Sequence, residues 1–157
     1  MIRERIEQDL DRLVDVLSSV RAVQDVLGDR SAYDWLTEVD ADVSWVFDQA
    51  PVSVAPTRNV VGHVQVYAPP VGAAWVSSAA SGAGVEPDRL LVIGRFFVKE
   101  TRFDHNIGRY LLSECVKRIA ARGSVAVLDP DGLALVPTAL WRRLGFAADT
   151  HAPVLLA

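Results

Sequence analysis

The sequence predicts one α/β domain over residues 1–157, and three observations lead to this prediction. A chain of 157 residues with 50% hydrophobic content suits one globular core. Segments with the period-two pattern of strands are interspersed with segments of helical periodicity. No internal repeat, low-complexity tail or linker divides the chain.

The N-terminal part begins with a weakly alternating segment, residues 2–6, which predicts a short strand. From Gln8 onward, apolar residues recur every three or four positions, so we expect one helix that ends before Gly28. Residues 31–42 fit a short helix or a loop. Residues 44–48 predict the next strand.

Two strands are predicted in the middle of the chain. After a Pro-bounded connection at 50–58, residues 59–67 alternate with period two. This alternation assigns Val60, Val64 and Val66 to one face, and Val61, His63, Gln65 and Tyr67 to the other. A short helix is expected within 73–80. The nearly continuous apolar run 89–99 predicts the central strand, covered on both faces.

The C-terminal third alternates helices and short strands. A polar turn at 100–105 leads to a helix from about Asn106, whose apolar residues have helical spacing. Residues 125–128 predict a short buried strand, and 134–144 predict a further helix. One or two edge strands are expected within 146–156.

Composition argues against several classes of protein. A lone cysteine, Cys115, forms no intrachain disulfide, so we expect a reducing, cytoplasmic location, with Cys115 packed in the core. The histidines and the cysteine lack the spacing of a structural zinc site, so no metal is expected. An acidic pI of about 5.3 without a Lys/Arg stripe argues against nucleic acid. No apolar run reaches about 18 residues, which argues against a membrane span.

Charge is unevenly distributed along the chain. Residues 1–50 carry 5 basic and 12 acidic side chains, whereas residues 101–157 carry 7 and 5. Such an asymmetry suits an anionic cofactor on one side and a cationic substrate on the other. Ordinary solvated surface charge explains it as well.

The unit formed by strand 90–98, the polar turn and the helix from Asn106 can hold a phosphate. A helix start presents backbone N–H groups without intrahelical partners, and these can bind phosphate oxygens. Every strand–turn–helix unit shares this property, so the geometry alone is a weak indication.

Three stretches carry a family resemblance. Residues 95–112 (RFFVKETRFDHNIGRYLL) resemble, without a gap, the R-L-F-V-x-P-x-x-R-G-x-G-I-G-R-x-L-L stretch of GNAT-superfamily N-acetyltransferases. Residues 140–146 (LWRRLGF) resemble the superfamily's L-Y-x-R-L-G-F signature, and residues 60–64 (VVGHV) its "VVGHV" strand. The resemblance implies a GNAT-like fold, with a mixed, mostly antiparallel central sheet and helices on both faces. It also implies acetyl-CoA as cosubstrate and an amine acceptor.

The resemblance implies the cofactor-binding residues. In the family, the R-G-x-G-x-G loop wraps the pyrophosphate through backbone N–H groups, and a strand amide, here that of Phe97 or Val98, polarises the thioester carbonyl. At the loop positions this chain retains only the last glycine, and Asp104 adds a negative charge that should weaken binding. The full set is Phe96, Phe97, Val98, Phe103, Asp104, His105, Asn106, Ile107, Gly108 and Arg109.

Two residues are candidates for catalysis. Trp141 takes the place of the family's tyrosine, which is thought to protonate the departing thiolate, and an indole N–H supplies no proton near neutral pH. His63 is the leading candidate for the base that takes the amine's proton. The alternative is that His63 is hydrogen-bonded within the sheet. Glu100, at the end of the central strand, is a second candidate base, or a solvated turn residue.

Two functions follow. The first is an acetyl-CoA-dependent N-acetyltransferase, in which a primary amine of a small molecule or peptide attacks the thioester directly. The alternative is a catalytically degenerate GNAT-fold module that binds CoA or a protein partner. A homodimer is a further expectation, because the apolar segment 152–156 can form an edge strand that pairs with a second copy.

Overall fold

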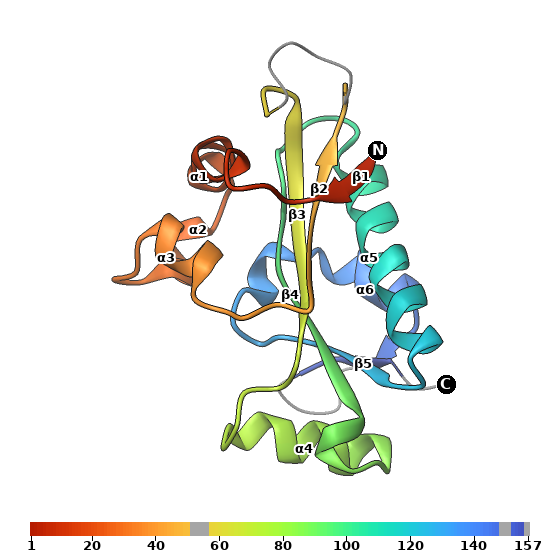
Figure 1. Cartoon of the computed structure of the whole chain (residues 1–157). Coiled ribbons are helices and arrows are strands. Elements are labelled where there is room, and N and C mark those ends of the chain that lie inside the picture. The colour runs from red at the N-terminus through yellow and green to blue at the C-terminus, as the bar shows by residue number, and fades with distance from the viewer. Residues whose placement is uncertain (51–56, 148–151, 156–157) are drawn as a thin grey trace.

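A seven-stranded sheet with helices on both faces forms the centre of the computed structural model, which describes residues 1–50, 57–147 and 152–155 (Figure 1). The strands lie in the order β1-β2-β3-β4-β5-β7-β6. Only β4 and β5 pair in parallel, and the other neighbours are antiparallel. The mixed, mostly antiparallel sheet is therefore confirmed. The strands are β1 (Ile2–Glu4), β2 (Val43–Asp48), β3 (Val60–Tyr67), β4 (Leu90–Val98), β5 (Val125–Leu128), β6 (Phe146–Ala147) and β7 (Val154–Leu155).

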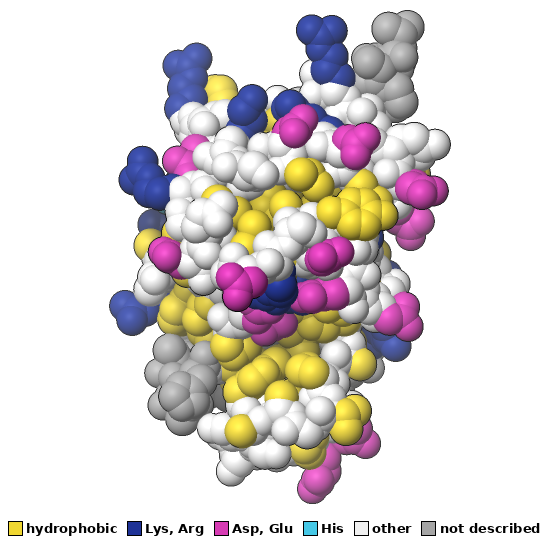
Figure 2. All heavy atoms as spheres, turned by 90° about the vertical axis from the view of Figure 1, so that its left-hand side faces the viewer, with side chains coloured by type: hydrophobic (Ala, Val, Ile, Leu, Met, Phe, Trp, Pro, Cys, Tyr) yellow, Lys and Arg dark blue, Asp and Glu magenta, His cyan; other side chains and the backbone are white. Residues whose placement is uncertain are grey.

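Helices α1 to α3 lie on one side of the sheet and α5 on the other, with α4 beyond one end (Figure 1). Each face has its own apolar core, one packed under α1 to α3 and one under α5 and α6. On the face that carries α1 to α3, charged side chains cross the middle and hydrophobic side chains gather below them (Figure 2). The helices are α1 (Asp9–Ser19), α2 (Val23–Leu27), α3 (Ala32–Thr37), α4 (Ala74–Ala83), α5 (Asp104–Ala121) and α6 (Thr138–Arg143), with 3₁₀ turns η1 (Pro87–Arg89) and η2 (Leu133–Leu135).

The first predicted helix is in fact two, so the expectation of one helix up to Gly28 is wrong. Helix α1 ends at Ser19, and Ala22 adopts a left-handed conformation with a φ of 67°. This conformation cannot continue an α-helix. The break changes the direction of the chain, so that α2 buries Val23 and Val26 in the same core as α1. Within the ambiguous segment 31–42, a short helix forms because Ser31 caps α3 by accepting a hydrogen bond from the Asp34 N–H.

The predicted faces of β3 need a correction at Val60. Asp48 pairs with Val60 and Phe47 with Gly62, so Val61 is an extra residue in β3. This bulge reverses the alternation. Val60 therefore packs under α1, and Val61 packs under α5 with Val64 and Val66.

The C-terminal third also departs from the expectation. The helix expected over 134–144 is a 3₁₀ turn, η2, followed by α6, because Pro137 between them has no N–H to continue the hydrogen-bond ladder. Strand β7 lies between β5 and β6, so Val154–Leu155 do not form the free edge that the dimer prediction assumed. Parts of the predicted segments 50–58 and 146–156 lie outside the described residues. In the described residues, no helix is long and apolar enough to cross a bilayer.

Candidate functional site

Strands β4 and β5 separate in the middle of the sheet. They are paired as far as Ile93 and Leu128, and the Asp129 N–H still donates a hydrogen bond of 3.0 Å to the Ile93 carbonyl. Strand β4 then continues to Val98, whereas the chain after β5 turns away toward η2. Arg95, with a φ of 54°, lies in a bulge of β4 at this point. Because a bulge bends its strand, it directs the second half of β4 away from β5.

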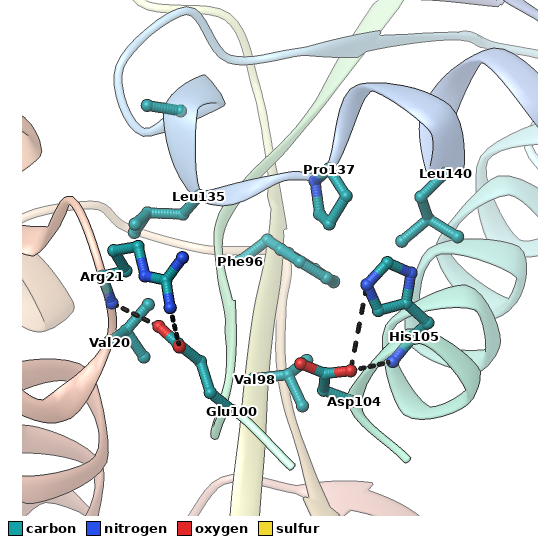
Figure 3. A pocket seen from close by; sticks show the side chains of 11 residues that line it. Val20, Arg21, Phe96, Val98, Glu100, Asp104, His105, Leu135, Pro137 and Leu140 are labelled. Carbon is teal, nitrogen blue, oxygen red and sulfur yellow. Dashed lines mark hydrogen bonds and ion pairs between the residues drawn. The ribbon is translucent and has the colours of Figure 1, made fainter. Parts of the chain in front are cut away.

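A groove of about 240 Å³ lies where the two strands separate (Figure 3). Apolar side chains of Phe96 and Val98 from β4 and of Leu135 and Leu140 from the η2 and α6 segments line it, and Ala134 and Pro137 complete this part. Its rim is polar. The rim carries Arg21, Glu100, Asp104 and His105.

At one side of the rim, the segment after α1 contacts the end of β4. The Arg21 N–H donates a hydrogen bond of 2.5 Å to Glu100 Oε1, and Arg21 Nη2 lies 3.9 Å from Glu100 Oε2 (Figure 3). The Arg21 side chain is 91% exposed. Its guanidinium is therefore free to reorient toward another anion.

The start of α5 holds the residues that the resemblance assigned to the pyrophosphate. Asp104 Oδ1 accepts a hydrogen bond of 2.7 Å from the His105 N–H (Figure 3). The Phe103 N–H donates to Thr101 Oγ1, at 3.2 Å. Side chains of this chain thus already accept hydrogen bonds from two of the amides in the loop that the resemblance assigned to the pyrophosphate.

The structure distributes most of the predicted cofactor residues over four places. Phe96, Val98, Asp104 and His105 line the groove. Asn106 and Ile107 instead line a separate shallow depression, and Phe103 and Arg109 are exposed. Gly108 is buried where α5 meets β4 and α6, and a Cβ there would lie 2.9 Å from Phe96 Cζ and 3.2 Å from Leu140 Cδ2.

Two further predicted side chains lie away from the groove lining. The Phe97 ring is fully buried on the α1 face and stacks on the His63 ring at 5.4 Å. Trp141 is buried in the core under α5, and its ring has the Arg142 guanidinium 5.5 Å away. Cys115 packs in the same core, and burial raises the pKa of its thiol.

His63 is fully buried in β3 and hydrogen-bonded within the sheet. Its Nδ1 lies 2.7 Å from the Arg95 carbonyl and its Nε2 lies 3.1 Å from Arg5 Nη1. Since a carbonyl only accepts and a guanidinium only donates, His63 is neutral with its proton on Nδ1. Burial lowers the pKa of His63 to about 3. The imidazole therefore holds the carbonyl of the bulge residue Arg95.

Sequence reasoning missed a buried polar network on the α3 face of the split. The Arg95 guanidinium lies 5.0 Å from the Trp35 ring, donates to Glu38 Oε1 at 2.5 Å and has its Nη1 3.6 Å from Asp129 Oδ2. The Tyr67 hydroxyl donates a hydrogen bond to the same Asp129 oxygen. The sequence did contain one signal for this network. Asp129 directly follows the buried strand 125–128, which lies beside the central strand.

Comparisons with known proteins identify the fold. No protein-family model matches the sequence, and no curated protein matches it. A GNAT family acetyltransferase from Brucella melitensis, solved with acetyl-CoA, superposes with a TM-score of 0.61 at 19% identity, over 99% of this chain and 86% of that one.

Two further solved structures are similar. NAA60 from Arabidopsis thaliana, solved with acetyl-CoA, has a TM-score of 0.60 at 17% identity, over 98% of this chain and 95% of that one. The aminoglycoside 6'-N-acetyltransferase from Enterococcus faecium has a TM-score of 0.58 at 14% identity, over 99% and 93%. These likenesses show that the chain has the GNAT fold.

Proposed function

We propose that this GNAT-fold chain is an N-acetyltransferase that transfers the acetyl group of acetyl-CoA to a primary amine. The observation that carries the proposal is the groove between the separated ends of β4 and β5, apolar inside and polar at its rim. An apolar groove of this kind suits the pantetheine arm of acetyl-CoA, and a polar rim suits its phosphates. The acceptor is a small molecule or a peptide.

The backbone of β4 supports activation of the thioester. The Lys99 N–H donates to the Val61 carbonyl at 2.7 Å, on the β3 side of the strand. Successive N–H groups of a strand point to opposite sides, so the Val98 N–H faces the split. An amide in this place can stabilise the negative charge that develops on the carbonyl oxygen during attack. Of the two predicted amides, we therefore propose Val98 for this role.

The thiolate can leave without an acid. A thiol has a pKa of about 8.5, so the departing thiolate is stable enough to leave unprotonated near neutral pH. Trp141, in the position of the family's tyrosine, lies in the core and makes no contribution to this step in our proposal.

The second candidate function is a module that binds CoA or a partner without catalysis. The hydrogen bond from the His105 amide to the Asp104 carboxylate favours the module that binds a partner, because this amide already has an acceptor and is less available to a phosphate oxygen of CoA. Glu100 adds a second carboxylate on the rim. Both charges weaken the binding of an anionic cofactor.

One pair of variants tests the cofactor site. Ala134 lines the groove at an exposed position, and the equally exposed Ala139 lies on α6 outside the lining, so Ala134→Trp adds a bulky ring at the edge of the groove and Ala139→Trp is its matched control. We expect acetyl-CoA to bind the wild type and the control by calorimetry, and to lose affinity for Ala134→Trp. Equal affinity in all three proteins would contradict the proposed site.

A second experiment separates the enzyme from the binding module. Release of free thiol from acetyl-CoA is followed with a panel of small primary amines and short peptides. Amine-dependent release supports the transferase. Binding without release from any amine supports the module.

A cytoplasmic location and a homodimer stay predictions. Because β7 lies inside the sheet, a dimer would have to use another surface than the segment first considered. Light scattering of the purified chain tests the homodimer.

A further inference from the structure

Asp129 lies at the point where β4 and β5 separate. Its N–H makes the hydrogen bond to Ile93 beyond the last paired residues of the two strands. Its side chain is 9% exposed. The fully enclosed His63 has no such access to solvent. Asp129 is therefore a largely buried titratable group at the split that keeps a small contact with solvent.

Tyr67 holds the Asp129 carboxylate from across β4. Its hydroxyl donates to Asp129 Oδ2, and the Asp131 N–H donates to Oδ1 at 2.9 Å. Tyr67 reaches Asp129 over Gly94, where a Cβ would lie only 1.9 Å from the Tyr67 hydroxyl oxygen. The absence of a side chain at Gly94 thus makes the contact possible. Each carboxylate oxygen has a second lone pair and can accept a further proton or hydrogen bond.

The charges around Asp129 come from three segments. Tyr67 faces it from β3, Arg95 from β4 at 3.6 Å, and Asp131 from the turn after β5. Burial raises the pKa of Asp129, and the hydrogen bonds from Tyr67 and Asp131 and the Arg95 charge oppose this only in part.

Asp131 is a nearby carboxylate with the opposite tendency. Burial would raise its pKa, but the hydrogen bond from Arg30 and the charge of Arg95 lower it below its usual value. Arg30 Nη1 lies 2.8 Å from Asp131 Oδ2, and about a third of each side chain is exposed. A carboxylate that is held ionised in this way is a weaker base than Asp129.

We infer that Asp129 takes the proton from the acceptor amine, and that the acceptor reaches the thioester from the part of the surface beside α3. This inference rests on the proposed function. Tyr67 acts as a positioning residue. Acidic side chains gather on this face around the middle of the molecule (Figure 2), and Glu38 is partly exposed there, which favours an acceptor that arrives as an ammonium ion.

The proton and electron balance is as follows. The ammonium ion gives one proton to Asp129 and becomes a neutral amine with a free lone pair. The lone pair forms the C–N bond to the thioester carbon, and the C–S bond then breaks with its electron pair on sulfur. The second proton of the nitrogen passes to the thiolate or to water, and Asp129 returns its proton to solvent.

The test compares Asp129→Asn with Asp131→Asn, since both residues lie near the Arg95 guanidinium. Calorimetry with acetyl-CoA first establishes that each variant is folded and binds the cofactor. We expect Asp129→Asn to lower the rate at saturating acetyl-CoA by about 100-fold or more, the usual contribution of a general base. We expect Asp131→Asn to keep most of the rate.

A third variant tests the role of Asp129 through the pH dependence of kcat/KM. A purely structural role of Asp129 would not change this dependence. Because the Tyr67 hydrogen bond favours ionised Asp129, Tyr67→Phe raises the pKa of Asp129. The acid limb of kcat/KM therefore moves to higher pH in Tyr67→Phe and disappears in Asp129→Asn.

The outcomes separate this inference from the proposed function. Amine acetylation by the wild type, with an unchanged rate and pH profile in Asp129→Asn, overturns only the role of Asp129. An equal loss of rate in Asp129→Asn and Asp131→Asn also overturns the role of Asp129. Such a result would show that the rate depends on the polar network around Arg95 as a whole. Failure of the wild type to bind acetyl-CoA, or to acetylate any amine of the panel, overturns the proposed transferase and this inference with it.

Discussion

The backbone N–H of Arg21 donates a hydrogen bond of 2.5 Å to the Glu100 carboxylate, and this contact joins the segment after α1 to the end of β4. Both residues lie on the rim of the groove, where the phosphates of a bound CoA would lie in our proposal. The contact places a carboxylate close to that position and keeps the exposed Arg21 side chain beside it. The two charges act on an anionic cofactor in opposite directions.

Glu100→Gln should bind acetyl-CoA more tightly than the wild type. The substitution removes a negative charge from the rim and retains an oxygen that can accept the Arg21 hydrogen bond. We expect about threefold tighter binding, or about 0.6 kcal/mol, which is the scale of an exposed charge pair. Calorimetry measures the affinity. Acetyl-pantetheine, which lacks the phosphates, is the control, and an equal gain with it would contradict the electrostatic explanation.

Asp104→Asn should raise the affinity for acetyl-CoA and lower the stability of the fold. The Asp104 carboxylate is in the first turn of α5, where a negative charge stabilises a helix by about 0.3–1 kcal/mol. The same charge repels a phosphate. Chemical denaturation and calorimetry measure the two effects. Weaker binding in this variant would indicate that the carboxylate orders the amides for the cofactor.

Gly108→Ala should lose stability and cofactor affinity together. The added Cβ would lie 2.9 Å from Phe96 Cζ, and both Phe96 and the nearby Leu140 line the groove. We expect a loss of about 1–3 kcal/mol from overpacking and a weaker affinity for acetyl-CoA. The matched control is Gly62→Ala, whose Cβ would lie 3.1 Å from Leu111 Cδ1 on the same helix, outside the lining. An equal loss of affinity in the control would show that the effect is not local to the groove.

His63 should make the fold less stable below neutral pH. The folded state holds its pKa at about 3, against 6.5 for a free histidine, so only the unfolded state takes up the proton between these values. Stability from this group is therefore complete above pH 6.5 and is lost as pH falls toward 3. From pH 7 to pH 5 the loss amounts to about 2 kcal/mol.

Urea denaturation of His63→Gln at both pH values checks this expectation. The difference between wild type and variant should shrink by about the same amount between pH 7 and pH 5. A constant difference for His63→Gln would contradict the assignment of a neutral, buried imidazole.

The local pattern of the sequence was sufficient for most of the elements. The apolar run at 89–99 and the alternation at 59–67 specify β4 and β3, because strands at the centre of a sheet bury both faces. The motif at residues 95–112 led to the GNAT fold and to the groove residues Phe96 and Val98. These features depend on neighbours in the chain, and the sequence shows such neighbours directly.

The errors come from features without a local pattern. The left-handed Ala22 separates α1 from α2, and the extra Val61 shifts the register of β3 by one residue; only the packing against the sheet selects them. For His63, the sequence left both a base and a sheet-bonded residue open. Contacts with Arg5 and Arg95, residues distant in the sequence, decided in favour of the hydrogen-bonded arrangement.

The sequence by itself determined the order of the elements, the class of fold and the strand–turn–helix unit at the groove, since hydrophobic periodicity and a contiguous motif carry that information. Only the tertiary structure decided which polar side chains meet. Asp129, Tyr67 and Arg95 come from three different strands or their ends, and their meeting depends on the bulge at Arg95 and on the missing side chain at Gly94. Contacts of this kind form only when the sheet is assembled, because no part of the chain contains all of their members.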